Sequence, residues 1–151
     1  MKLLGILGLL STCSLSAAHV THEQVSALIA KAEEGQKNSY APYSQYFVGA
    51  AVLTKSGKMY SGCNVENASY GLANCAERTA VFKAVSEGDK EIVAVAVVTR
   101  DGGMPCGACR QVLNEFNPDM VVISVDEKHT KLFESSLSKL LPHSFGPANL
   151  E

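Results

Sequence analysis

Three cysteines in two short motifs constrain the fold of this chain more than any other feature. Cys75 opens the segment Cys-Ala-Glu-Arg, and Cys106 and Cys109 belong to Pro-Cys-Gly-Ala-Cys-Arg-Gln, which begins at Pro105. Each motif follows a loop and begins a predicted helix, where unpaired backbone N–H groups and the helix dipole favour a thiolate. If the two helix starts meet, the three sulfurs can bind one metal ion. The fold must therefore bring together two segments that are distant in the sequence.

The number of ligands indicates the kind of site. A structural zinc site is usually closed by four protein ligands, whereas a catalytic site leaves one position for water. No fourth ligand lies at a matching spacing, because Cys63 falls on a predicted strand and His129 and His143 are isolated. Glu77, two residues after Cys75, could then move protons beside an open zinc site. A Cys-x-x-Cys pair alone is also typical of a redox pair or half of a structural zinc site, and a glutamate in a first helical turn often only complements the dipole.

The composition predicts one soluble globular domain. The 151 residues are 46% apolar and 19% charged, which is the balance of a chain with a packed core. Thirteen basic residues against fifteen acidic ones give a net charge of -2. This balance argues against a nucleic-acid partner and against a polybasic membrane-surface protein.

Residues 1–18 differ from the rest of the chain. Lys2 is followed by a wholly apolar run from Leu3 to Leu10 and by small residues up to Ala18. This layout is typical of a secretory signal peptide that is cleaved after Ala18. A buried N-terminal helix or an uncleaved extension is the alternative, and residues 19–151 are expected to form the single functional domain.

Strands alternate with helices after an initial hairpin, which predicts an α/β sandwich with a mixed sheet. A two-residue turn at Ser56-Gly57 is expected to join the first two strands. The helices are expected at 21–36, 75–85, 105–116 and 133–141, and the strands at 47–54, 59–65, 92–99 and 120–125.

Taken together, these motifs resemble the small, homotetrameric, zinc-dependent cytidine deaminases. A Cys-x-Glu segment followed at a distance by Pro-Cys-x-x-Cys is the signature of zinc-dependent nucleobase deaminases. The likeness runs from about Tyr40 to Leu150 and includes the segments at 41–44, 48–51, 62–68, 75–80, 105–111 and 140–142. It implies a three-layer α/β sandwich in which a mixed sheet of about five strands is flanked by helices, and it makes residues 19–151 the catalytic domain.

The same resemblance implies roles for the residues around the cysteines. Cys75, Cys106 and Cys109 would hold Zn²⁺, and Glu77 would be the catalytic proton shuttle. Arg78 would donate hydrogen bonds to the ligand sulfurs and offset the negative charge of three thiolates. From its residue type alone, Arg78 could equally be a surface residue of the helix.

Five further residues would contact the substrate. Asn64 and Glu66 are two apart on a predicted strand and so face the same way, and the family uses these positions for the ribose hydroxyls. A solvent-facing polar stripe is the alternative. Tyr46 stands where the family usually has a phenylalanine that packs on the pyrimidine ring. Tyr70 and Phe145 match positions that contribute to a neighbouring subunit's active site, although core aromatic residues would give the same pattern.

The function expected from the resemblance is hydrolytic deamination of cytidine and deoxycytidine to uridine and deoxyuridine in pyrimidine salvage. The expected assembly is a homotetramer with shared active sites, a nucleoside as the small-molecule substrate, and no nucleic acid or membrane as a partner. A related deaminase of another small pyrimidine-like substrate and a non-catalytic, zinc-stabilised secreted binding protein are the alternatives. The leader indicates secretion, whereas the family resemblance implies a cytoplasmic protein.

Overall fold

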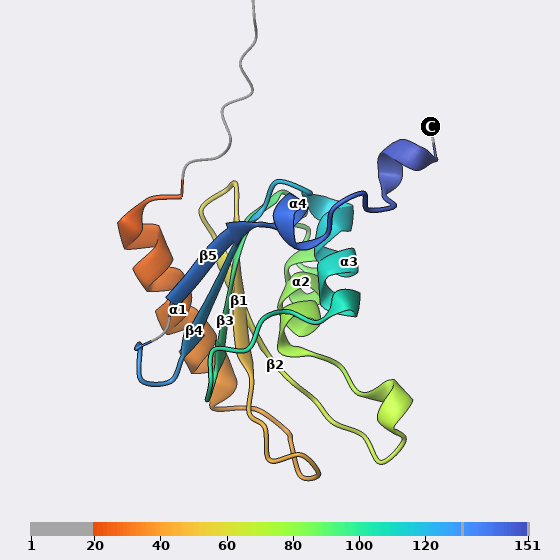
Figure 1. Ribbon diagram of the computed structural model, residues 1–151. Coiled ribbons are helices and arrows are strands. Elements are labelled where there is room, and N and C mark those ends of the chain that lie inside the picture. The colour runs from red at the N-terminus through yellow and green to blue at the C-terminus, as the bar shows by residue number, and fades with distance from the viewer. Residues whose placement is uncertain (1–19, 131, 151) are drawn as a thin grey trace, which may run out of the picture.

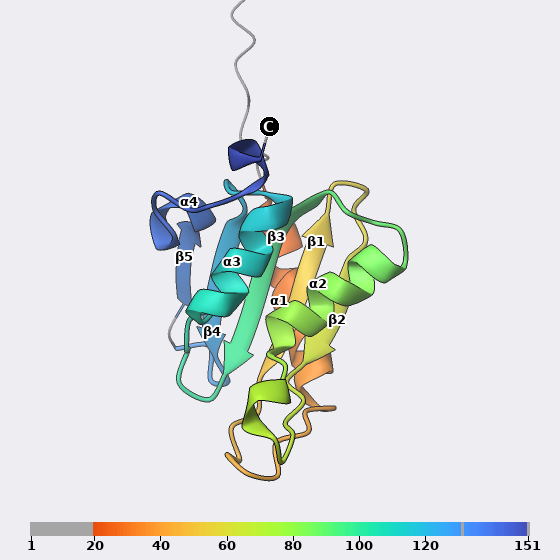
Figure 2. The same cartoon turned by 90° about the vertical axis from the view of Figure 1, so that its right-hand side faces the viewer.

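The computed structural model describes residues 20–130 and 132–150, in which a mixed five-stranded sheet lies between two helical layers (Figure 1). α1 covers one face of the sheet, and α2 and α3 lie side by side on the other (Figure 2). The predicted three-layer α/β sandwich is therefore confirmed. The elements are α1 (His22–Gln36), β1 (Gly49–Thr54), β2 (Met59–Cys63), η1 (Tyr70–Leu72), α2 (Ala76–Ser86), β3 (Ile92–Thr99), α3 (Gly107–Phe116), β4 (Val121–Asp126), β5 (Leu132–Ser136), α4 (Leu137–Leu140) and η2 (Pro147–Asn149).

The start of α1 follows from its capping residues. The Thr21 hydroxyl accepts a hydrogen bond from the Gln24 backbone N–H at 3.2 Å, and the Gln24 side chain accepts one from the Thr21 N–H at 3.0 Å. This reciprocal capping box satisfies two backbone donors that a helix start leaves unpaired. The buried face of α1, which includes Leu28 and Ile29, then packs against β1, β2 and β3. The helix predicted at 21–36 is confirmed.

The strand order, β2-β1-β3-β4-β5, sets the position of the two helix starts. β2 and β3 are both antiparallel to β1, so they run in the same direction, and β3 is parallel to β4. α2 follows β2 and α3 follows β3, so the two helices begin at the same end of the sheet and return across the same face. The cysteine motifs are therefore brought together by the topology.

Both faces of the central strands are buried. Ala50 and Val52 of β1 pack toward α2, whereas Ala51 and Leu53 pack toward α1. α2 approaches β2 closely at Gly62, where a Cβ would lie 2.4 Å from the Ala80 nitrogen. Only a glycine allows this spacing, which sets the distance of α2 from the sheet.

Two sequence predictions were wrong. Four residues separate β1 from β2, whereas a two-residue turn was expected. The Gly57 backbone N–H donates a hydrogen bond to the Thr54 carbonyl oxygen, and Gly57 has a φ of +86°. A tight turn followed by a residue in this left-handed conformation makes a longer hairpin loop than two residues. The helix expected at 133–141 is instead strand β5 followed by the short α4. β5 pairs antiparallel with β4, and this ladder overrides the local helical pattern.

The predicted signal peptide, residues 1–18, lies outside the described residues. Across 20–130 and 132–150, none of the helices combines the length and the apolar composition that a membrane span requires.

Candidate metal centre

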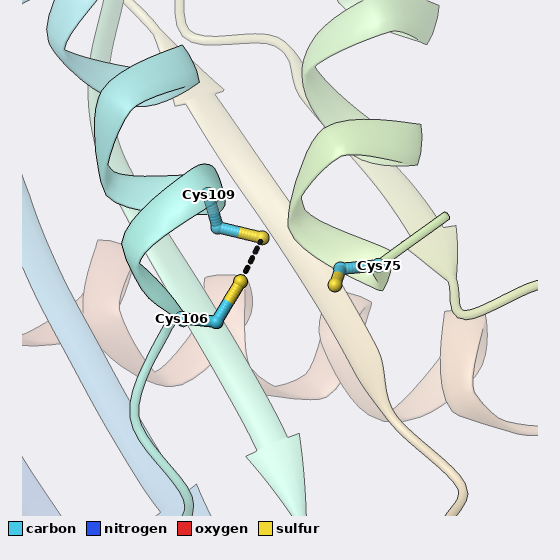
Figure 3. A group of neighbouring side chains, drawn as sticks. All are labelled: Cys75, Cys106 and Cys109. Atoms are coloured by element: carbon cyan, nitrogen blue, oxygen red, sulfur yellow. Dashed lines mark hydrogen bonds between the residues drawn. The ribbon is translucent and has the colours of Figure 1, made fainter. Parts of the chain in front are cut away.

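The three predicted ligands meet between the starts of α2 and α3. Cys75 is the N-cap residue of α2, Cys106 is the N-cap residue of α3, and Cys109 lies in the first turn of α3. Figure 3 shows the three side chains converging in the space between the two helices, in front of the sheet. Their sulfurs all lie within 4.8 Å of one another, and the Cys106 and Cys109 sulfurs are 3.6 Å apart.

This geometry fits a zinc ion. Tetrahedral zinc with Zn–S bonds of about 2.3 Å places its sulfur ligands roughly 3.8 Å apart. The observed separation of the Cys106 and Cys109 sulfurs is close to that value, and Cys75 is near enough to complete a three-sulfur set. Among the cysteine, histidine and acidic side chains of the described residues, these three cysteines form the group that lies close enough together to hold a metal ion. The donor set therefore leaves one tetrahedral position for a non-protein ligand.

The local environment favours a thiolate at Cys75. The pKa of Cys75 is lowered to about 5, chiefly because the Cys109 thiol donates a hydrogen bond to it and also because Arg78 lies beside it. The pKa of Cys109 is raised, first by the same hydrogen bond and then by burial. Because the thiolate is the form that binds a metal ion, the lowered pKa of Cys75 favours metal binding at this sulfur.

Arg78 and Glu77 flank the sulfurs. The Arg78 guanidinium donates from Nη2 to the Cys75 sulfur at 3.4 Å, and its buried Nε has no protein partner. Arg78 is half-buried, so it is not the surface residue that its type alone allowed. Glu77 is only 4% exposed, and burial raises the pKa of its carboxyl group. A carboxyl whose pKa is raised toward neutrality is suited to accept and to release a proton.

A pocket of about 610 Å³ opens beside these groups. It is large enough for a nucleoside-sized ligand. Its lining includes Tyr46, Asn64, Glu66, Tyr70, Glu77 and Cys106.

Asn64 and Glu66 line the pocket, although they lie just beyond the end of β2 rather than on the strand. The Asn64 side chain accepts a hydrogen bond from Val48 N at 2.9 Å and donates one to Tyr46 O at 2.8 Å. Glu66 accepts hydrogen bonds from the Ser44 hydroxyl and from the backbone N–H of Tyr43 and Ser44. Both side chains therefore hold the 43–48 loop against the pocket.

The remaining predicted contacts lie in different places. Tyr46 forms part of the pocket wall, and Tyr70 lies at its edge with 76% of its surface exposed. Phe145 is 61% exposed and does not line the pocket of its own chain. Neither Tyr70 nor Phe145 is a core residue, so that alternative is wrong for both.

Two polar residues that the sequence analysis missed support this pocket. The Ser44 hydroxyl donates to Glu66, and Asp101 accepts a hydrogen bond from the Tyr46 hydroxyl at 2.5 Å. Ser44 lies in the 41–44 segment, which was given no role, and Asp101 is the second residue after the buried strand β3, in a loop, where side chains often reach a site. The position of Asp101 in the sequence could therefore have indicated a site residue, but nothing in the sequence indicated that it binds the Tyr46 hydroxyl.

Comparison with known proteins identifies the family. The family model for the cytidine and deoxycytidylate deaminase zinc-binding region matches residues 22–125. The chain belongs to this deaminase family. Zinc is accordingly its cofactor, and the three-cysteine cluster is the group in the described structure that could bind it.

Individual relatives are similar over most of their length. The cytidine deaminase of Sporosarcina psychrophila is 44% identical over 128 residues, which cover 83% of this chain and 94% of that protein. The cytidine deaminase of Halalkalibacterium halodurans is 48% identical over 120 residues, covering 78% and 91%. A crystal structure of cytidine deaminase from Burkholderia pseudomallei superposes with a TM-score of 0.76 at 47% identity, covering 83% of this chain and 99% of that one.

Proposed function

We propose that this chain is a cytidine deaminase that hydrolyses cytidine and deoxycytidine to uridine and deoxyuridine, releasing ammonia. The observation that carries the proposal is the meeting of three sulfurs with a buried glutamate at a nucleoside-sized pocket. The relatives named above are cytidine deaminases, which supports the same substrate here. They do not favour a different small substrate or a non-catalytic binding protein.

The cluster residues have separate tasks in this reaction. When bound by Cys75, Cys106 and Cys109, zinc supplies a Lewis acid that makes water a nucleophile near neutral pH. Glu77 accepts a proton from the attacking water and delivers it to N3 of the pyrimidine. The same carboxyl group then takes the second proton, from the hydroxyl group that has added to C4, and delivers it to the amino group, which leaves C4 as ammonia. Arg78 donates to the Cys75 sulfur and so reduces the charge of the thiolate cluster.

Substrate contacts are assigned to groups with spare hydrogen-bonding capacity. Asn64 retains a second amide hydrogen, and Glu66 retains acceptor lone pairs, after each has bound the 43–48 loop. We propose that these two residues bind the ribose hydroxyls. The hydrogen bonds from Ser44 and the loop backbone lower the pKa of Glu66, so its carboxylate is charged and should repel a 5′-phosphate. Cytidine should therefore have a higher catalytic efficiency than cytidine monophosphate, and equal efficiencies would contradict this role.

Several aromatic side chains remain uncovered in the single chain. Tyr70 and Phe145 are largely exposed, and the Phe145 carbonyl is fixed by hydrogen bonds from Gln111 and Asn114. We propose that a homotetramer covers these rings and completes each pocket from a neighbouring subunit. Light scattering of the zinc-loaded protein tests this assembly, and a stable, fully active monomer would refute it.

The N-terminal segment is assigned from its sequence. We propose that residues 1–18 are a signal peptide that is removed and that residues 19–151 are the catalytic domain. N-terminal sequencing of the natural protein tests this cleavage. A mature protein that begins at Met1 would refute it.

The enzymatic proposal is tested with the zinc-loaded protein and cytidine. The expected result is a time-dependent loss of cytidine absorbance, with uridine and ammonia formed in equal amounts. Zinc should be present at about one ion per chain. A fully loaded protein that turns over no cytidine or deoxycytidine would overturn the proposal.

A further inference from the structure

The tyrosine in the pocket wall donates its hydroxyl hydrogen bond to a residue that does not line the pocket. The Tyr46 hydroxyl donates to Asp101 Oδ1 at 2.5 Å, and the Arg100 guanidinium carbon lies 4.9 Å from the centroid of the same ring. Tyr46 lines the pocket, but neither Arg100 nor Asp101 does. Thr99 and Gly103, which lie beside the Tyr46 hydroxyl, do line the pocket, so the hydroxyl lies at the pocket wall and is bound there by a residue outside the lining.

The acceptor is itself fixed by the ends of two central strands. The buried Thr99 donates from its hydroxyl to Asp101 Oδ1 at 3.1 Å and accepts from Gly103 N at 2.6 Å. The Ser124 hydroxyl of β4 lies 3.0 Å from the carbonyl oxygens of both Gly102 and Gly103. Asp101 is thus a rigid support although it lies at the surface.

Gly103 leaves the space that this arrangement needs. A Cβ at this position would lie 2.7 Å from the Tyr46 hydroxyl oxygen, closer than real Cβ contacts. The next neighbours, Thr99 Oγ1 at 3.4 Å and Asp101 Oδ1 at 3.5 Å, would be ordinary contacts. Gly103 is not among the glycines with a positive φ, so its backbone conformation accepts an alanine. The tyrosine hydroxyl is therefore the principal obstacle to a side chain here.

The ionisation of the two partners is consistent with a strong hydrogen bond. Burial and then the Asp101 carboxylate raise the pKa of Tyr46, so the phenol remains a donor. The Tyr46 hydroxyl is the main cause of the lowered pKa of Asp101, so the carboxylate remains an acceptor.

We propose that Asp101 is a positioning residue for substrate binding: it holds the Tyr46 hydroxyl out of the pocket so that the ring presents an apolar wall to the pyrimidine. This inference rests on the proposed function and deepens it. Tyr46 then serves as a phenylalanine would, and its extra hydroxyl is neutralised by the 99–103 loop. Loss of Asp101 removes the charged acceptor of the phenol and leaves it the neutral Thr99 hydroxyl, so the ring is held less firmly and substrate binding is weakened more than chemistry.

The test is a double-mutant cycle on the zinc-loaded enzyme. Asp101→Ala should raise KM for cytidine about tenfold, while kcat changes less than about threefold, because one charge-assisted hydrogen bond is lost. In the Tyr46→Phe background, the same Asp101→Ala change should alter KM by less than about twofold, because no hydroxyl is left to position. Asp119→Ala, which removes an exposed carboxylate that does not line the pocket, is the matched control.

Gly103→Ala provides a second, independent variant. It should also raise KM by displacing Tyr46, and Tyr46→Phe should reverse most of that increase by removing the atom that the new Cβ meets. If Asp101→Ala does not fold, Asp101→Asn, which keeps the shape of the side chain and removes its charge, replaces it in the same cycle, because Gly103 itself lines the pocket and its variant tests only the space around the hydroxyl. Equal effects of either change in the tyrosine and phenylalanine backgrounds would overturn the proposal, as would a parallel loss of kcat and zinc. Absence of turnover in the zinc-loaded wild type would instead refute the proposed function.

Discussion

Replacing Glu77 with glutamine is the sharpest test of the catalytic assignment. Glutamine has the same shape as glutamate but cannot carry a proton between two sites. Glu77 is 4% exposed in the first turn of α2, so the substitution keeps the packing and removes the acid–base function. A buried glutamate that only complements the helix dipole would be worth no more than about 2 kcal/mol.

The expected loss is much larger than a dipole effect. General acid–base catalysis by one positioned group is worth about 10²- to 10⁴-fold, and Glu77 is assigned every proton transfer of the reaction. We therefore expect kcat for cytidine to fall about 10⁴-fold, which corresponds to roughly 5 kcal/mol. Zinc content should stay at the wild-type level, because the three cysteines are untouched.

The assay compares initial rates of cytidine loss and bound zinc in the two purified proteins. Glu23→Gln is the control, because Glu23 lies in the first turn of α1 but is exposed and far from the pocket lining. It should leave kcat unchanged. A Glu77→Gln enzyme that keeps kcat within tenfold of wild type while retaining zinc would refute the proton-shuttle role.

Three other substitutions test the metal site and the fold. Cys106→Ala should bring bound zinc close to zero by metal analysis and lower Tm by at least about 5 °C, because metal binding and folding are coupled. Hydrogen bonds, first from Ser56, lower the pKa of Asp89 below its ordinary value of 3.8. The charged Asp89 carboxylate therefore stabilises the fold above pH 3.8, and this stabilisation is lost as the pH falls through the lower pKa of the folded state. Asp89→Asn should therefore lower Tm at pH 7, and the gap from wild type should shrink below pH 3.8; a constant gap would contradict this account. Gly62→Ala would place a Cβ 2.4 Å from the backbone of α2, so it should lower the free energy of unfolding by about 1–3 kcal/mol, as measured by chemical denaturation. The control is Gly71→Ala, which has open space around it and should change the free energy of unfolding by less than about 0.5 kcal/mol.

The site was predictable where its chemistry is local. Cys106 and Cys109 are neighbours on one helix, so their spacing already indicates a shared ion. Glu77 is placed by its distance from Cys75 along another helix start. The support of Tyr46 by Asp101 was not predictable, because these residues are far apart in the sequence and meet only where the 99–103 loop reaches the pocket wall.

The fold divides along the same line. Capping residues and continuous apolar runs are local, and they correctly placed α1 and β3, respectively. β5 was mistaken for a helix because its strand conformation depends on pairing with β4 rather than on its own side chains.

The sequence by itself determined which groups are present: three thiols and a carboxyl, each at the start of a helix. Only the tertiary structure decided that they lie together. β2 and β3 run in the same direction because each pairs antiparallel with β1, and this places the starts of α2 and α3 side by side. No local pattern specifies that pairing, since hydrogen bonds between distant strands create it.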